Sequence, residues 1–214
     1  VRFMYQGGFR GHEARKIRFG DVEMDKRKDG KPVAIIQIDA DTKTGRREAV
    51  MNGNTFLNVK SHLMKGIKIR NKQISLMNEK LLGGNKVLDF HNRLHKKELP
   101  EVHNPEKDDL VLMNPFLNGK RRIYHESYIR DMWNLVVREC DFKQRYTLYS
   151  LRSTHISYQL LQGISVNKVA KNVGTSMAMI QMTYDRLSSR YSIDELGFFK
   201  DTKVPNKGDD ELIN

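Results

Sequence analysis

Consecutive amphipathic helices are predicted over residues 125–184, and this feature constrains the fold more than any other. Apolar side chains recur at helical spacing over residues 125–140, which predicts a helix with one apolar side. The side chains of that side are Tyr128, Ile129, Met132, Trp133, Val136, Val137 and Cys140. A helix with such a side normally buries it against other elements, so we expect this side to belong to a core.

Three further helices are predicted after this one. Ser150 is a suitable N-cap for a helix that ends near Gly163. The next helix spans residues 166–173 and stops at Gly174, because glycine readily takes the left-handed conformation that ends a helix. Ser176 then caps the last of the series. The chain is therefore expected to be mainly helical.

A small antiparallel sheet is predicted near the N-terminus. Residues 32–38 are rich in β-branched and apolar side chains, which favours a strand. Turn-forming residues follow at 39–45, and residues 46–51 return as a second strand. The result is a hairpin with Lys43 near its tip.

Elsewhere the pattern is less regular. We expect a short helix over 11–19, mostly helix over 54–82, an exposed loop over 95–109 and a short strand over 110–113. Together with the hairpin, these elements make the expected fold class α+β, mainly helical, with a small antiparallel β-sheet near the N-terminus.

The charge of the chain favours a polyanionic partner. Lysine and arginine number 38 against 26 acidic residues, which gives a net charge of +12. Such an excess is typical of proteins that bind the phosphates of nucleic acids.

Cys140 is the single cysteine, which excludes an intrachain disulfide and a cysteine-based zinc cluster. Neither a membrane span nor a signal peptide is indicated, and the scattered histidines indicate no metal site, so no cofactor is expected.

One local pattern allows two interpretations. Ala170, Gly174 and Ile180 have the spacing of a helix-turn-helix motif, in which the second helix enters the major groove of DNA. That helix would present Met177, Met179 and other apolar side chains, which offer few hydrogen-bond donors to base edges. A helix-turn-helix regulator therefore remains an alternative interpretation of the same residues.

Several separated segments together resemble the catalytic domain of the tyrosine recombinase (phage integrase) family. The resemblance lies in Gly8-Phe-Arg-Gly-His-Glu13, Asp41-Thr-Lys-Thr-Gly45, Tyr149-Ser-Leu-Arg-Ser-Thr154, Val173-Gly-Thr-Ser176 and Met179-Ile-Gln-Met-Thr-Tyr184. Their order along the chain is that of the family, and the separation between Arg152 and Tyr184 also suits it. The resemblance implies a site-specific recombinase or integrase that cleaves and rejoins DNA.

The resemblance also implies a role for each matching residue. Tyr184 would be the nucleophile, forming a 3′-phosphotyrosyl link, and Lys43 would be the general acid for the leaving 5′-oxygen. Arg10 and Arg152 would form a phosphate clamp. Guanidinium groups suit that clamp, because they match the non-bridging oxygens that gather negative charge during attack. Glu13 would orient Arg10 or its helix.

Two positions depart from the family pattern. Tyr149 stands where the family often has histidine, and Thr175 stands where it often has histidine or tryptophan. Both hydroxyls can form a hydrogen bond with a phosphate oxygen, but neither titrates near neutral pH. His155, three residues after Arg152, is a possible substitute base, and its alternative role is that of a packing histidine.

The organisation expected for the whole protein follows from the resemblance. Residues 1–199 would form the catalytic domain and residues 200–214 a charged tail, with an N-terminal DNA-binding domain missing upstream. The expected partner is double-stranded DNA, bound by a homotetramer with accessory DNA-bending proteins. Residues 196–199 are expected to dock on a neighbouring protomer. The expected location is the cytoplasm, at the nucleoid, in a bacterial or phage system.

Besides a helix-turn-helix regulator, two alternatives to an active recombinase remain. A type IB topoisomerase would use similar chemistry and relax DNA without pairing sites. A degenerate recombinase, inactivated by the changes at Tyr149 and Thr175, would bind DNA without cleaving it.

Overall fold

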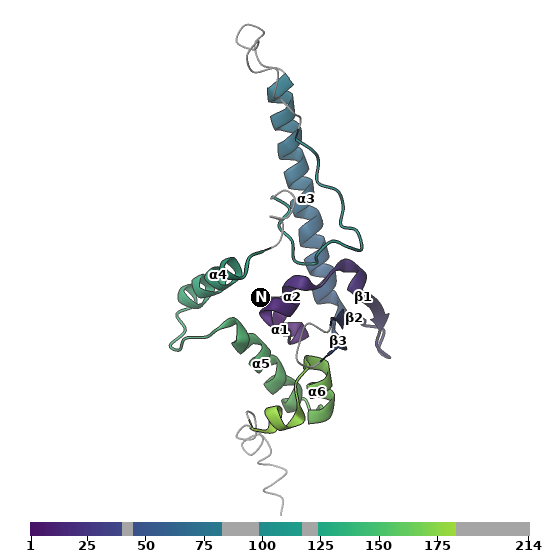
Figure 1. Cartoon of the computed structure of the whole chain (residues 1–214), viewed down its shortest axis with the longest axis vertical. Coiled ribbons are helices and arrows are strands. Elements are labelled where there is room, and N and C mark those ends of the chain that lie inside the picture. Colours follow the sequence, from purple (N-terminus) through teal and green to yellow (C-terminus); the bar gives the residue numbers. More distant parts are fainter. Residues whose placement is uncertain (40–44, 83–98, 117–123, 183–214) are drawn as a thin grey trace, which may run out of the picture.

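The computed structural model describes residues 1–39, 45–82, 99–116 and 124–182 (Figure 1). Within these ranges the chain is mainly helical, with one small sheet, which confirms the predicted fold class. The elements in chain order are α1 (Arg2–Gly7), α2 (Gly11–Lys16), the short 3-10 helix η1 (Phe19–Asp21), β1 (Val22–Lys26), β2 (Pro32–Ile38), β3 (Arg47–Asn52), α3 (Gly53–Leu82), α4 (Glu126–Glu139), α5 (Leu148–Leu161) and α6 (Val166–Val173). Residues 177–182 form a further helical segment.

The sheet is antiparallel, with strand order β1-β2-β3. The predicted hairpin is confirmed in its two strands, which pair from Ile38 opposite Arg47 to Val33 opposite Asn52. Strand β1 was not predicted; four of its five residues are exposed, so it lacks the apolar alternation that marks a half-buried strand. Lys43 lies outside the described residues.

One face of the sheet packs on the N-terminal helices to form the main core. Alternate residues of β2 and β3 point into it, and Phe9 fills its centre with an almost fully buried ring. Its other buried members are Phe3, Met4, Ala14, Ile17, Ala34, Ile36, Ile38, Ala49, Met51, Phe56 and Val111. This core fixes α1 and α2 against β3.

A second core joins α5, α6 and the helical segment 177–182. Its buried side chains are Ile156, Val169, Ala170, Val173 and Ile180. The predicted bounds of α6 and its end at Gly174 are confirmed, and the Ser176 hydroxyl accepts a hydrogen bond from the Met179 backbone at 3.2 Å. The predicted N-cap of α5 is wrong. Thr147 holds that position, and its backbone N–H donates to the Ser150 hydroxyl.

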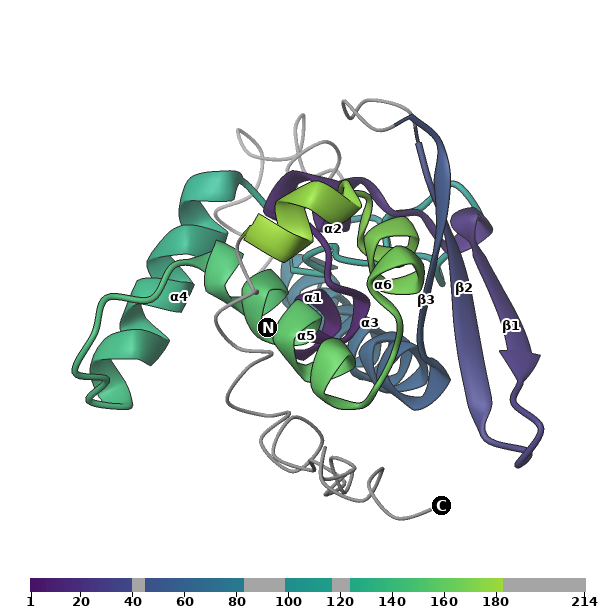
Figure 2. The ribbon, with the colours of Figure 1, turned by 90° about the horizontal axis from the view of Figure 1, so that it is seen from below.

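Helix α4 has the predicted bounds but not the predicted burial. It lies on the side of the domain opposite the sheet (Figure 2), and only Trp133 of the helix is buried. The Trp133 indole N–H donates to the Tyr146 carbonyl at 2.9 Å, which ties α4 to the turn before α5. The remaining apolar side is exposed at Tyr128, Met132, Leu135 and Val136. Helical periodicity predicts that one face of a helix is apolar. Whether that face is buried depends on which other elements pack against it, and periodicity does not show this.

Helix α3 extends away from the rest of the domain, and residues 99–113 run back along it (Figure 1). Residues 99–109 form neither helix nor strand and are mostly exposed, which agrees with the expected loop, although Val102 is buried against α3. The strand expected over 110–113 is wrong, because these residues do not form one. Two asparagines of α3, one helical heptad apart, hold the returning chain. Asn71 exchanges two hydrogen bonds with the Val102 backbone, at 2.9 and 2.8 Å, and Asn78 does the same with Leu99, at 3.1 Å each. These bonds satisfy backbone groups that a strand would satisfy by sheet pairing.

The returning segment also closes a third core. Leu63, Ile67 and Ile74 of α3 pack against Val102 and Met113. Towards the sheet, Leu110 makes a single antiparallel bridge with Arg18 in place of the expected strand.

We expect Asn71→Ala to release this segment. The change removes the acceptor of the Val102 amide, so hydrogen exchange at Val102 should become about fivefold faster, which corresponds to the roughly 1 kcal/mol of a typical hydrogen bond. Gln73→Ala, at an exposed position of the same helix, is the matched control. Equal exchange rates at Val102 in both variants would show that the asparagine does not hold the segment.

Candidate active site

A buried carboxylate, Glu13, lies at the centre of the candidate site. Its side chain is 1% exposed, and two arginines donate to it. Arg10 donates from Nη1 at 2.7 Å, and Arg47 donates from Nη1 and Nη2 at 3.2 and 3.0 Å. Burial raises the pKa of this carboxyl, but hydrogen bonds from Arg47 and Arg10 outweigh burial and hold the pKa below its usual value. Glu13 is therefore a stable anion among cations.

The turn before α2 places Arg10 beside this carboxylate. Gly8 ends α1 in the left-handed conformation, with φ of 60°, and Phe9 anchors the turn in the main core. Arg10 is the N-cap of α2, and its backbone N–H donates to Glu13 at 2.9 Å. The sequence pattern of glycine, apolar residue, arginine and later acid thus corresponds to one compact local structure.

Arg152 enters the same cluster from α5. Its side chain is 1% exposed, and its Nη1 donates to the Gly8 carbonyl at 2.7 Å. Burial, together with the positive charge of Arg10, lowers the pKa of Arg152 to about 10, so the group stays protonated at neutral pH. Its Nε is buried and has no hydrogen-bond partner among the described residues. An orphaned buried donor of this kind is costly unless some acceptor reaches it.

The two arginines predicted to form the clamp meet at one oxygen. Arg10 Nη2 donates to the Gly174 carbonyl at 2.8 Å, and Arg152 Nη2 approaches the same oxygen at 3.4 Å. Arg10 and Gly174 are 164 positions apart in the sequence. The fold therefore brings together the separated segments 8–13, 149–154 and 173–176, at α2, α5 and the end of α6 (Figure 2).

Arg47 was missed by the sequence analysis. It stands at the start of β3, and its side chain is 8% exposed. Its Nε donates to the Asn172 carbonyl at 3.3 Å. The same Nε lies close to Gly174, so a Cβ atom at position 174 would come within 2.5 Å of it. One signal could have identified it. Arg47, Ala49 and Met51 alternate along the strand, so the arginine shares the inward face of two core residues.

His155 packs behind Arg152. The ring is 4% exposed, lies against Gly8 and meets the Tyr5 ring edge-on. A side-chain carbon on Gly8 would come within 2.6 Å of this ring, so the close approach of α1 to α5 requires glycine. Burial, together with the charge of Arg152, lowers the pKa of His155 to about 4. This environment favours the packing role over proton transfer.

Tyr149 and Thr175 border the cluster. Tyr149 is 61% exposed and lies one turn before Arg152 on α5. Thr175 lines a hollow of about 580 Å³ that also includes Arg47, Lys171 and Gly174. Both hydroxyl positions are thus at the edge of the arginine cluster. Lys43 and Tyr184, the predicted general acid and nucleophile, lie outside the described residues.

The charge of the cluster suits an anionic ligand. Arg10, Arg47 and Arg152 carry three positive charges, and Glu13 supplies one negative charge. The excess positive charge lies in a poorly hydrated environment, where electrostatic interactions are stronger than in bulk water. Such an arrangement can stabilise the charge that develops on a phosphate under attack.

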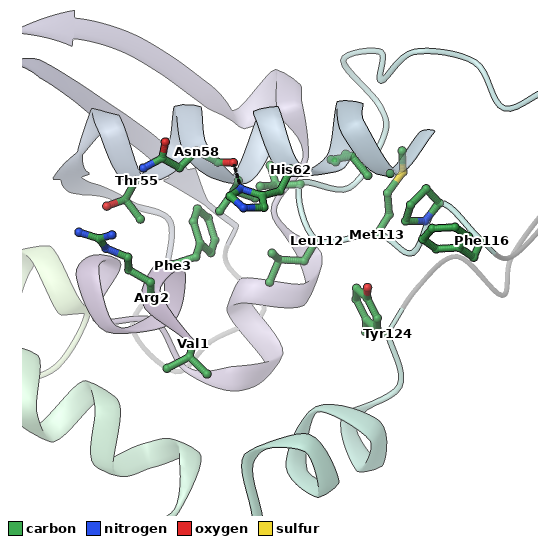
Figure 3. A pocket seen from close by; sticks show the side chains of 15 residues that line it. Val1, Arg2, Phe3, Thr55, Asn58, His62, Leu112, Met113, Phe116 and Tyr124 are labelled. Atoms are coloured by element: carbon green, nitrogen blue, oxygen red, sulfur yellow. Dashed lines mark hydrogen bonds between the residues drawn. The ribbon is translucent and has the colours of Figure 1, made fainter. Parts of the chain in front are cut away.

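A second hollow, of about 530 Å³, lies between α1, α3 and residues 111–116 (Figure 3). Phe3, Leu112, Met113 and Phe116 give it a largely apolar lining, and none of the described site residues contributes to it.

No cluster of three or more His, Cys, Asp or Glu side chains within the described ranges could hold a metal ion. None of the helices described is both long and apolar enough to cross a membrane.

Comparison with solved structures identifies the fold. XerA recombinase matches with a TM-score of 0.55 and 14% identity, over 92% of this chain and 57% of that chain. The pre-cleavage complex of XerH site-specific recombinase with difH substrate matches with a TM-score of 0.51 and 15% identity, over 89% of this chain and 43% of that chain. The post-cleavage complex of XerH with palindromic difH substrate matches with a TM-score of 0.50 and 14% identity, over 91% of this chain and 44% of that chain. The chain thus has a tyrosine-recombinase-like fold.

The chain spans about half the length of these solved structures. No protein-family model matches its sequence, and no curated protein matches it.

The burial of His155 predicts a specific pH dependence of stability. The unfolded chain binds a proton at the usual pKa near 6.5 and the folded chain only at about 4, so protonation favours unfolding. The stability attributable to neutral His155 is complete above pH 6.5, and it falls by roughly 1.4 kcal/mol per pH unit as the pH drops from 6.5 to 4. Urea unfolding across this range should show a shallower decline for His155→Gln than for wild type. His12→Gln, at an exposed site, should retain the wild-type slope, and parallel curves for wild type and His155→Gln would contradict the account.

Proposed function

We propose that this chain is the catalytic domain of a DNA strand-breaking and rejoining enzyme of the tyrosine recombinase type. The observation that carries the proposal is the convergence of Arg10 and Arg152 on the Gly174 carbonyl oxygen. Two guanidinium groups that share one acceptor can also share a phosphate, which offers several such oxygens. The recombinase-like fold supports the same conclusion.

In this proposal the scissile phosphate replaces the Gly174 carbonyl as the acceptor of hydrogen bonds from Arg10 and Arg152. Arg10 is partly exposed, with 26% of its side chain accessible, so it meets the phosphate first. Arg152 is enclosed, and its buried Nε has no acceptor among the described residues, so it is available as a donor to the same group. Tyr149, exposed one turn away, adds a hydroxyl donor to a phosphate oxygen.

The proposed reaction exchanges one phosphoester for another. The Tyr184 hydroxyl oxygen attacks phosphorus and forms the new P–O bond, while the bond from phosphorus to the 5′-oxygen breaks. Lys43 donates a proton to the leaving 5′-oxygen, and the phenolic proton of Tyr184 passes to water. The reverse reaction, with a 5′-hydroxyl as the attacking group, rejoins the strand. The energy of the cleaved bond is stored in the phosphotyrosine, so the cycle consumes no nucleotide triphosphate.

The proposed substrate is double-stranded DNA containing a specific site. The matched XerH structures contain difH substrate, and the net charge of +12 on this chain suits a polyanion. We further propose that the protein acts as a homotetramer with accessory DNA-bending proteins, in the cytoplasm. Residues 196–199 would dock on a neighbouring protomer, and residues 1–199 would form the catalytic unit.

A degenerate recombinase is the second candidate. The observation that favours it is the pair of hydroxyl residues, Tyr149 and Thr175, at positions where the family often has histidine or tryptophan. His155, the substitute base that the sequence offered, is enclosed behind Arg152. Such a protein would bind DNA specifically and form no covalent bond with it.

The test is covalent capture on DNA. A pool of randomised duplexes with a nick, so that the cleaved end diffuses away, is incubated with wild type, Tyr184→Phe or Tyr158→Phe. Wild type and Tyr158→Phe should give a denaturant-resistant protein–DNA adduct, because Tyr158 is an exposed tyrosine of α5 outside the cluster. Tyr184→Phe should give none, because it lacks the attacking oxygen.

Specific binding of DNA by wild type without any adduct would favour the degenerate recombinase. An adduct formed equally by Tyr184→Phe would refute the assignment of the nucleophile.

A further inference from the structure

Arg47 has a bonding pattern unlike that of either clamp arginine. Each of its three nitrogens donates to the protein, two to the carboxylate oxygens of Glu13 and one to the Asn172 carbonyl. Its side chain is 8% exposed, against 26% for Arg10. The planar fork of Arg47 therefore faces the carboxylate, and each of its nitrogens already has a protein acceptor, unlike Nε of Arg152.

The strand that carries Arg47 is itself fixed to α6. The Asn172 side chain accepts a hydrogen bond from the Val50 backbone N–H at 2.6 Å and donates to the Val50 carbonyl at 3.3 Å. The backbone carbonyl of the same asparagine accepts from Arg47 Nε. Asn172 thus continues the edge of β3 and holds Arg47 in register with the turn at Gly174.

Glu13 transmits this register to Arg10. The oxygen that accepts from Arg47 Nη1 also accepts from Arg10 Nη1, and the oxygen that accepts from Arg47 Nη2 also accepts from the Arg10 backbone. With both oxygens held by the fork, the carboxylate has one orientation. Arg10 Nη2 is then directed at the Gly174 carbonyl, the acceptor that the proposed phosphate would replace.

We propose that Arg47 is a positioning residue, which orients the clamp arginine Arg10 through Glu13 and does not itself contact the phosphate. The inference rests on the proposed function for its catalytic consequence, but the geometric part stands independently. Without Arg47 the carboxylate keeps the donors from Arg10 and the ion pair with Arg152, but it loses the fork that fixes both of its oxygens. Misplacement of a catalytic group by about 1 Å can cost roughly a hundredfold in rate.

The first measurement is structural and needs no activity. Arginine side-chain NMR of the free protein follows the guanidinium signals of Arg10, assigned by their loss in Arg10→Ala. Wild type and Arg46→Ala should show Arg10 with slow, restrained rotation, because Arg46 is the exposed neighbour on the same strand end. In Arg47→Lys, which keeps the charge and removes the fork, these signals should become averaged. Unchanged Arg10 signals in Arg47→Lys would overturn the proposal.

The second measurement is a double-mutant cycle on single-turnover DNA cleavage. Arg47→Lys should lower the cleavage rate about a hundredfold with nearly unchanged DNA affinity, and Arg46→Ala should remain close to wild type. In an Arg10→Ala background, Arg47→Lys should cause little further loss, because it acts through Arg10. If the rate losses of the two single variants multiply in the double variant, Arg47 acts independently of Arg10, and the proposal is overturned.

The two measurements separate this inference from the proposed function. Absence of cleavage by wild type refutes the function, and the NMR comparison then still decides whether Arg47 orients Arg10. A cleaving enzyme with unaltered Arg10 signals in Arg47→Lys refutes the positioning role and leaves the function intact.

Discussion

The interaction of Glu13 with Arg10, Arg47 and Arg152 is the constraint on which the rest of the site depends. Buried guanidinium groups repel one another and lose their hydration, and they are tolerated only where an anion and hydrogen-bond acceptors compensate. Glu13 supplies that anion, with Arg152 at 4.0 Å and the other two in direct hydrogen bonds. The three cations come from three different elements, namely the start of α2, the start of β3 and α5. One carboxylate therefore holds together segments from both ends of the described chain.

Two glycines allow this approach. Gly8 has the left-handed backbone that ends α1 and leaves room for the His155 ring, and its carbonyl accepts from Arg152. Gly174 likewise ends α6 in the left-handed conformation and leaves room for the Arg47 side chain. Its carbonyl then accepts from both Arg10 and Arg152. The turns that place the arginines are thus also the turns whose carbonyls satisfy them.

Much of the fold could be predicted where local pattern alone determines it. The bounds of β2, α4 and α6 were predicted closely, because alternation, helical periodicity and glycine ends are properties of short segments. Strand β1 and the exposed side of α4 could not be predicted, since both depend on what packs nearby. For the site, the local motifs pointed to Arg10, Glu13 and Arg152, which the structure brings together. Arg47 escaped notice because a basic chain has many arginines, although its alternation with Ala49 and Met51 placed it on the inward face of the predicted strand.

The central claim is that the negative charge of Glu13 holds the arginine cluster together. Glu13→Gln tests it most directly, since glutamine keeps the size and one acceptor oxygen but removes the charge. The account predicts that urea unfolding of this variant at neutral pH will show a loss of about 3–5 kcal/mol in the free energy of unfolding, the usual cost of leaving a buried ion unpaired. A free energy of unfolding equal to that of the wild type would contradict the account, because the three guanidinium groups would then not need the carboxylate.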